Sequence, residues 1–460
     1  MEFKLDNAAL TAGTQTSGIS RPRSIELDFE GIRFDASRYQ EIDSEKYSLF
    51  NLLQDERIDD TSFNARVSML DSWVEDMTLH GHYLYRRELI SGCKPVSTVV
   101  DGATGEYRQM INLGSNDYLN LSQHPRVIQA AIACIQEYGV GSGSAPMFSG
   151  TMRVHRQLEK ELASMKGCDD AITFPSGYAA NSGTIGALLR KNDVAIYDRY
   201  CHASLFDGSV AGNRLVFSHN DMRSLEFVLQ KAQNRFVNKL ILLDGVYSMD
   251  GDIAKLDEIV AMAHHYGAWV MVDEAHATGI IGKTGKGTPE YFDLIGKVDI
   301  VSDTLSKTLG SIGGYIAGSH KLMSLLKNAA RSFVFSSSGP VMAAAAALES
   351  LKVIQEEPEL RTRLWENIHY LRSKLIALGF DLGNSETAII PLVLGDDYKV
   401  KEMSARLDQA GIFVNSVPYP AVPRRLSRVR ISVTAGLTRE DLDKVIFEAA
   451  RIGRELAVIN

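Results

Sequence analysis

The chain has 460 residues, of which 45% are hydrophobic, so it is long enough for a large buried core and for two or three domains. Its net charge of −8 comes from residues 1–80, which hold 16 Asp and Glu against 8 Lys and Arg, whereas the remaining residues hold 41 of each. This distribution offers neither a basic face for nucleic acid nor a polybasic patch for an anionic membrane.

Several features indicate a cytoplasmic protein. The longest apolar runs, such as 240–243, have the length of a strand and fall far short of the roughly 20 residues of a membrane span. The first residues lack the basic start and apolar middle of a secretory signal. The four cysteines are scattered without a C-x-x-C pair, so we expect no metal site and a reducing compartment.

The first 80 residues predict an acidic N-terminal extension. Residues 1–24 are rich in Thr, Ser, Gly and Ala and are expected to be a poorly ordered tail. From 44 to 87 the apolar residues recur at helical spacing, which predicts two surface helices. Residues 81–125 then form the first segment of the main fold, and a turn is expected at 101–105.

After this turn, short apolar runs alternate with longer amphipathic stretches, which is typical of an α/β domain. Residues 239–244, 268–273 and 298–302 are predicted strands, and each is apolar on both faces, as parallel strands covered by helices are. Polar residues follow all three strands, where open α/β sheets place their ligand sites. We therefore expect one site, in a large domain spanning 126–341.

A smaller C-terminal α/β domain is predicted for 342–460. It begins with a long Ala-rich helix and has strand-like runs at 388–394 and 429–433.

A nucleotide site is the first alternative for the polar residues. Asp273-Glu-Ala-His276 matches a helicase box, and 277–284 matches a permissive phosphate-loop pattern. A phosphate loop, however, follows a strand, opens a helix and precedes its acidic partner in the chain. Here the order is reversed and no helix start follows Thr284 directly. The Gly139-x-Gly141-x-Gly143 run follows a helical stretch and is a poor dinucleotide fingerprint.

Asp273 also suits a carboxylate facing a protonated pyridine nitrogen. Opposite charges at about 4 Å attract by roughly 4 kcal/mol at an effective dielectric of about 20. Carbanion chemistry on pyridoxal phosphate needs this pairing, a Schiff-base lysine and a phosphate cup. Lys307 provides a lysine of this kind, and the combination favours pyridoxal 5'-phosphate as the cofactor.

Two segments are candidates for the phosphate cup. Ser176-Gly-Tyr178 stands between a strand-like run and an Ala/Gly-rich helix, where backbone N–H groups bind phosphate. Thr304-Leu-Ser-Lys307 is the second candidate. An ordinary capped turn is the alternative for the first segment, and His202 is either a ring-stacking residue or a polar loop residue.

Seven motifs, taken in this order, resemble the α-oxoamine synthases, the family of oxononanoate synthase, aminolevulinate synthase, 2-amino-3-ketobutyrate CoA ligase and serine palmitoyltransferase. The resemblance covers roughly residues 83–455. The motifs are Asn116-Asp-Tyr-Leu119, Ser176-Gly-Tyr178, His202-Ala-Ser204, Gly245-Val-Tyr-Ser-Met-Asp-Gly251, Val272-Asp-Glu-Ala-His276, Thr304-Leu-Ser-Lys-Thr-Leu-Gly310 and Val429-Arg-Ile-Ser-Val-Thr434.

The resemblance implies an aspartate-aminotransferase type of fold, with a mixed seven-stranded large domain and a small C-terminal domain, in a homodimer. It implies that Lys307 binds the cofactor and removes the α-proton, that Asp273 pairs with the pyridine nitrogen and that His202 stacks on the ring. His276 and Ser248 match residues near the phenolic oxygen. The cup is matched by Ser176, Gly177, Tyr178, Thr304 and Ser306, and is completed by Ser337 from the neighbouring subunit.

The substrate carboxylate is assigned by the resemblance to Asn116 and Arg430. Because Arg428 and Arg430 share a strand face, geometry alone does not separate them. A planar guanidinium suits a two-point grip on a carboxylate. In the Gly-rich loop 141–151, Ala145-Pro146 departs from the family pattern near the amino-acid side chain, so Ala145 bears on substrate identity.

The implied reaction is the decarboxylative condensation of a small amino acid with an acyl thioester, on CoA or an acyl carrier protein, to give an α-amino ketone. Residues 306–314 and 331–335 favour a long-chain, serine-palmitoyltransferase-like substrate. An oxononanoate-synthase-like or cysteate-acyltransferase-like choice is the alternative. Among other classes, an aminotransferase or lyase needs only part of the motif set, and a non-catalytic partner subunit is expected to lack Lys307.

Overall fold

The computed structural model describes residues 62–101, 104–209 and 212–460. The second of the two helices expected near the N-terminus is α3 (Phe63–Leu79), which Ser62 caps by accepting the N–H of Ala65. Met69, Trp73 and Met77 form its buried stripe. The expected tail and the first helix lie outside the described residues.

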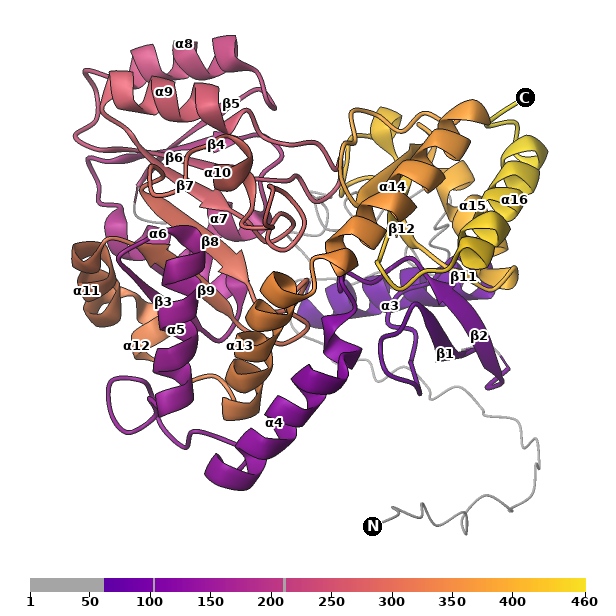
Figure 1. Cartoon of the computed structure of the whole chain (residues 1–460). Coiled ribbons are helices and arrows are strands. Elements are labelled where there is room, and N and C mark those ends of the chain that lie inside the picture. Colours follow the sequence, from indigo (N-terminus) through magenta and orange to yellow (C-terminus); the bar gives the residue numbers. More distant parts are fainter. Residues whose placement is uncertain (1–61, 102–103, 210–211) are drawn as a thin grey trace, which may run out of the picture.

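A mixed seven-stranded sheet forms the centre of the larger part of the molecule (Figure 1). Its strand order is β3-β9-β8-β7-β6-β4-β5, and only β9 runs against its neighbours. This confirms the fold class expected from the sequence. The strands are β3 (Asp170–Phe174), β4 (Val194–Asp198), β5 (Asn213–Phe217), β6 (Lys239–Asp244), β7 (Trp269–Asp273), β8 (Ile300–Thr304) and β9 (Gly314–Gly318).

The three predicted central strands are adjacent and parallel, as their two apolar faces required. Residues of each strand alternate between two cores, because successive side chains point to opposite faces of a sheet. In β6, Ile241 and Leu243 belong to one core, and Leu240 and Leu242 to the other. The strand predicted at 298–302 begins two residues later and extends to Thr304.

Helices cover both faces of this sheet (Figure 1). The helices of this part are α4 (Pro125–Tyr138), α5 (Arg153–Lys166), α6 (Gly177–Leu188), α7 (Ala203–Asp207), α8 (Met222–Ala232), α9 (Leu256–Tyr266), α10 (Thr288–Tyr291), α11 (His320–Ala329) and α12 (Arg331–Val334). Residues 277–287 form turns and α10 starts only at Thr288, so the phosphate-loop pattern does not open a helix at Thr284.

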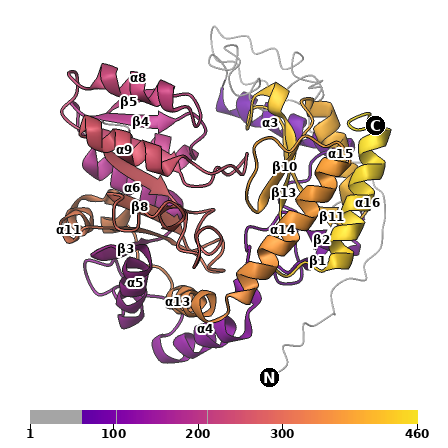
Figure 2. The same cartoon turned by 45° about the horizontal axis from the view of Figure 1, so that its top comes forward.

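The C-terminal part follows the predicted Ala-rich helix, α13 (Val341–Glu356), and is built on two small sheets (Figure 2). One sheet has the order β10-β13-β12, and the other joins β1 and β2 to β11, so strands from before residue 113 complete the C-terminal part. Whether the chain divides into domains at 125 and 341 stays a prediction. The elements are β1 (Val96–Val100), β2 (Tyr107–Asn112), η2 (Leu121–Gln123), α14 (Glu359–Ala377), β10 (Ile389–Val393), α15 (Asp397–Gln409), β11 (Ile412–Phe413), β12 (Asn415–Val417), η3 (Arg424–Leu426), β13 (Arg428–Ser432) and α16 (Arg439–Glu455).

Gly251, in the loop after β6, is a close contact between the two parts. Its carbonyl accepts hydrogen bonds from the N–H of Glu386 at 3.0 Å and from Thr387 Oγ1 at 2.9 Å. A Cβ built on Gly251 would lie 2.2 Å from the carbonyl oxygen of Ile389, and the residue has φ of 73°. Only glycine satisfies both conditions at this contact.

No helix in the described ranges is long and apolar enough to span a membrane.

Candidate functional site

The predicted catalytic side chains meet at the carboxyl ends of β6, β7 and β8. Asp273 is the last residue of β7, and Lys307 follows the end of β8 by three residues. Lys307 Nζ lies 2.7 Å from Nε2 of His276, and the charges of Asp273 and Arg430 both act on the lysine. The structure therefore brings together residues that lie more than 100 positions apart in the chain.

The Lys307 amine is tuned toward neutral pH. Burial disfavours its ammonium form and lowers its pKa to about 8, a shift that nearby Asp273 opposes and Arg430 reinforces. About a tenth of such amines are unprotonated at pH 7, compared with well under one in a thousand for an ordinary lysine. An unprotonated amine is what covalent bond formation to a carbonyl and removal of a proton both require.

His276 is a neutral ring next to this amine. Burial, together with the positive charges of Lys307 and Arg430, holds the pKa of His276 well below its usual value. Its Nδ1 lies 2.7 Å from the hydroxyl of Tyr118, so both ring nitrogens have partners. The ring is therefore fixed in place and uncharged.

Asp273 is fixed by two donors. Its Oδ1 accepts the N–H of Ala275 at 2.9 Å, and its Oδ2 accepts Nδ2 of Asn181 at 2.7 Å. The same amide group of Asn181 donates to Ser204 Oγ at 2.9 Å, and Ser204 Oγ lies 2.7 Å from Nδ1 of His202. The predicted nitrogen-pairing carboxylate and the predicted stacking ring are thus joined through Asn181.

The two segments predicted for the phosphate cup are in contact. Ser176 caps α6 by accepting the N–H of Ala179 at 3.1 Å. A Cβ on Gly177 would lie only 3.1 Å from Cβ of Thr304, so the missing side chain permits this close approach. Thr304 Oγ1 in turn lies 2.7 Å from Ser306 Oγ. The first-turn N–H groups of a helix have no partner within the helix, so this cradle of amides and hydroxyls fits a phosphate dianion.

Tyr178, also predicted for the cup, stands at its edge. It is about half exposed, and its hydroxyl donates to Asp207. Its ring meets the His202 ring edge-on, with 6.4 Å between centroids.

Arg430 has the properties of an anion-binding residue. Its Nε donates to the carbonyl of Ser248 at 2.6 Å, Nη1 to Ser432 Oγ at 3.0 Å and Nη2 to Asn116 Oδ1 at 3.2 Å. All three acceptors are neutral, and the side chain is buried. Each terminal nitrogen retains a second N–H. A buried cation whose hydrogen bonds go only to neutral acceptors favours a negatively charged ligand.

Arg428 is committed to the protein itself. It is 1% exposed, and its Nη1 donates to Asp250 Oδ1 at 2.7 Å and to the carbonyl of Met249 at 2.9 Å. The carboxylate of Asp250 neutralises its charge. The structure thus separates two arginines that strand alternation leaves equivalent.

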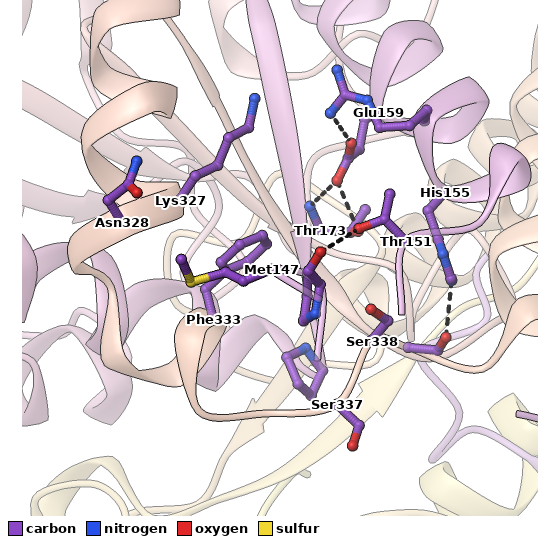
Figure 3. Close-up of a pocket in the computed structure, with 14 residues that line it drawn as sticks. Met147, Thr151, His155, Glu159, Thr173, Lys327, Asn328, Phe333, Ser337 and Ser338 are labelled. Carbon is purple, nitrogen blue, oxygen red and sulfur yellow. Dashed lines mark hydrogen bonds and ion pairs between the residues drawn. The ribbon is translucent and has the colours of Figure 1, made fainter. Parts of the chain in front are cut away.

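Among the described residues, no hydrogen bond links Ser337 or Ala145 to the cluster around Lys307. Ser337 lines a cavity of about 320 Å³ that is also lined by Pro146 and Met147 of the Gly-rich loop (Figure 3). The loop and the Ser337 segment are held together, because the N–H of Ser338 donates to the Ser144 carbonyl at 3.1 Å.

Three site residues were not singled out from the sequence. Tyr118 and Ser204 stand inside two of the family motifs, but their residue types alone do not mark a role. Asn181 is the fifth residue of α6 and follows Ala179-Ala180, where a polar residue looks like one at any other helix position. Asn181 precedes the apolar Ile185 by four residues, a spacing that places both on one, buried, side of the helix and is the one signal that points to Asn181.

Comparison with known proteins places these features in a family. Residues 108–447 match the model of the aminotransferase class I and II family. The chain is 42% identical over 398 residues to an 8-amino-7-oxononanoate synthase of Symbiobacterium thermophilum, covering 85% of this chain and all of that protein.

Solved structures agree. A serine palmitoyltransferase from Sphingomonas wittichii is 31% identical with a TM-score of 0.82, and one from S. paucimobilis, solved with a pyridoxal-phosphate–myriocin adduct, is 32% identical with a TM-score of 0.81. Each alignment covers 87% of this chain and all of the other. The chain therefore belongs to the aminotransferase class I and II family, in its α-oxoamine synthase group, and is a pyridoxal-phosphate-dependent acyltransferase.

Proposed function

We propose that this enzyme condenses a small amino acid with an acyl thioester, releases carbon dioxide and yields an α-amino ketone at the Lys307 site. The observation that carries the proposal is that Arg430, whose hydrogen-bond partners among the described residues are neutral, is near enough for its charge to help lower the pKa of Lys307. A carboxylate held by Arg430 is placed beside the group that accepts the α-proton.

The family resemblance suggests the residue roles, and the geometry of the site supports them. Lys307 would hold the cofactor covalently and would remove the proton from the α-carbon of the amino acid. Asp273, held by Ala275 and Asn181, presents its charge in one orientation. When bound, pyridoxal phosphate withdraws electrons from the α-carbon and so stabilises its carbanion.

The remaining side chains bind and orient. The helix start at Ser176-Gly177-Tyr178 and the hydroxyls of Thr304 and Ser306 hold the phosphate. His202 would pack on the cofactor ring, and His276 and Ser248 would face the phenolic oxygen. Asn116 supports Arg430 by accepting one of its N–H groups.

The acyl substrate is best supported as the oxononanoate type. Relatives named 8-amino-7-oxononanoate synthase reach 40–42% identity, whereas the serine palmitoyltransferase structures reach 31–32%. The long-chain preference drawn from 306–314 and 331–335 is therefore not confirmed. The product in that name is what alanine and a dicarboxylic acyl thioester would give after loss of carbon dioxide. Serine and a long acyl chain remain the second candidate pair, because the fold of a serine palmitoyltransferase matches this chain over that enzyme's whole length.

We further propose that the enzyme works as a homodimer in which Ser337 completes the partner's phosphate cup. Two bulky apolar side chains beside this segment support an interface there, since Phe148 is 83% and Phe335 is 74% exposed. Light scattering on the full chain tests the assembly, and a monomer of full activity would contradict it.

The reaction is tested by incubating the cofactor-bound enzyme with alanine, serine, glycine or cysteate, each paired with a pimeloyl or a palmitoyl thioester on CoA or an acyl carrier protein. Mass spectrometry of the products is expected to show the α-amino ketone of alanine and the pimeloyl group. Lys307→Ala serves as the control for uncatalysed chemistry. If a keto acid formed without thioester consumption, the enzyme would be an aminotransferase instead.

A further inference from the structure

We infer that Tyr118 is a positioning residue that keeps the proton of the neutral His276 ring on Nδ1, so that Nε2 stays an acceptor for the Lys307 amine. The inference rests on the proposed role of Lys307. It gives a specific task to a tyrosine whose residue type alone would suggest only packing.

A continuous row of hydrogen bonds runs from the amine through Tyr118. Lys307 Nζ lies 2.7 Å from His276 Nε2, and His276 Nδ1 lies 2.7 Å from the Tyr118 hydroxyl. The hydroxyl in turn donates to Asn116 Oδ1 at 3.3 Å, and Arg430 Nη2 donates to the same oxygen at 3.2 Å. The row thus connects the proton-accepting amine to the carboxylate-binding guanidinium.

Chemistry gives this row a single direction. A lysine ammonium has only donors, so Nε2 of His276 must accept. A neutral imidazole then carries its one proton on Nδ1 and donates it to the oxygen of Tyr118. The Tyr118 proton is left to point at Asn116 Oδ1, an oxygen that already accepts from Arg430. Every donor in the row therefore meets an acceptor.

Burial makes this direction matter. Tyr118 is fully buried and His276 is 7% exposed, so water has little room to replace a lost partner. Burial and the positive charge of Lys307 keep the His276 ring neutral, so the ring has one proton to place. The charged and titratable groups that act on the amine or the ring are Asp244 of β6, Asp273 of β7, Asp303 of β8, Arg430 of β13 and His202.

Removing only the hydroxyl reverses the preference of the ring. In Tyr118→Phe, a proton on Nδ1 faces an apolar edge and has no acceptor, so the tautomer protonated on Nε2 becomes favourable. That tautomer presents an N–H donor to Lys307. A neutral amine can accept this hydrogen bond, whereas an ammonium has no lone pair with which to accept it. The pKa of Lys307 is therefore expected to fall by about one pH unit, the equivalent of losing one hydrogen bond to a charged group.

The experiment measures this pKa in the full-length protein freed of cofactor. Trace acetylation over a pH series, read as the modified Lys307 peptide by mass spectrometry, gives the midpoint of amine deprotonation. Tyr197→Phe is the matched control, because Tyr197 is fully buried and, among the described residues, no hydrogen bond joins its hydroxyl to Lys307, His276 or Asn116. We expect the midpoint to fall by about one unit in Tyr118→Phe and to stay unchanged in Tyr197→Phe. Equal midpoints in Tyr118→Phe and the wild type would overturn the inference.

A second measurement does not depend on folding of the variant. Nitrogen NMR of the wild-type cofactor-free protein reports which nitrogen of His276 carries the proton. Protonated Nδ1 supports the inference, and protonated Nε2 overturns it. Because neither measurement uses turnover, absence of α-amino ketone formation would refute the proposed function and leave this result standing.

Discussion

Replacing Arg430 by Lys tests where the substrate carboxylate binds. The variant keeps the positive charge, so the electrostatic effect on Lys307 is retained, but it loses the planar pair of N–H donors. In the structure three N–H groups of Arg430 are used by Ser248, Ser432 and Asn116, which leaves one N–H on each terminal nitrogen. Losing one of two charge-assisted hydrogen bonds costs about 1.5–3 kcal/mol, and that corresponds to a rise of roughly 10- to 150-fold in the amino-acid KM.

The assay compares the binding of the amino acid with the binding of the corresponding amine, which lacks the carboxylate. Each compound is measured as a competitor in the same reaction. Arg430→Lys is expected to weaken binding of the amino acid and to leave binding of the amine unchanged. Arg428→Lys is the matched control, and because Arg428 binds Asp250 and the Met249 carbonyl, it is expected to lower thermal stability while leaving the amino-acid KM within about threefold. A larger KM effect from Arg428→Lys than from Arg430→Lys would show that the carboxylate binds elsewhere.

Three further substitutions address the remaining assignments. Lys307→Ala is expected to abolish turnover and the borohydride-reducible link to the cofactor, and a link that persists would identify another lysine. Asp273→Asn is expected to lower turnover by about a hundredfold or more, because the charge opposite the ring nitrogen is lost. The new amide also faces Asn181, so the double variant Asn181→Asp/Asp273→Asn is expected to restore the hydrogen bond but not the rate. Recovery of the rate in the double variant would show that geometry matters more than charge. Burial disfavours the charged form of His219, but its hydrogen bonds to Asp198 and Asp252 outweigh burial and raise its pKa from 6.5 to about 10. The protonated ring therefore stabilises the folded protein fully below pH 6.5, and this stabilisation is lost as the pH rises toward 10. Denaturant titrations of His219→Gln should therefore show a deficit in unfolding free energy that is largest near pH 6 and shrinks by pH 10, whereas a constant deficit would argue against a charged His219.

Sequence patterns predicted the parts of the site that depend on strand order. Asp273 ends one buried strand and Lys307 follows another, and parallel strands bring such residues to one edge of the sheet. The choice between Arg428 and Arg430 depends instead on which one meets Asp250, a contact across two parts of the chain that alternation does not encode.

Other features are invisible to a pattern for different reasons. The role of Asn181 depends on the distance between α6 and β7, which no local spacing fixes. The direction of hydrogen bonding through Tyr118 follows from the protonation of its neighbours, and a residue type does not report protonation. Pro146 and Ser337 line one cavity although almost 200 positions separate them in the chain.

The contact at Gly251 has a consequence for how this enzyme could be altered from a distance. Lys307 and Asp273 belong to the large sheet, whereas Arg430 lies on β13 and Asn116 follows β2, so the reacting amine and the carboxylate grip are carried by different parts of the molecule. Gly251 is a point where those parts meet with no room for a methyl group. Even alanine there would push the two parts away from each other, leaving each part folded but changing how they align. Selectivity among amino acids could thus be lost, or redrawn, by a change that touches neither substrate nor cofactor.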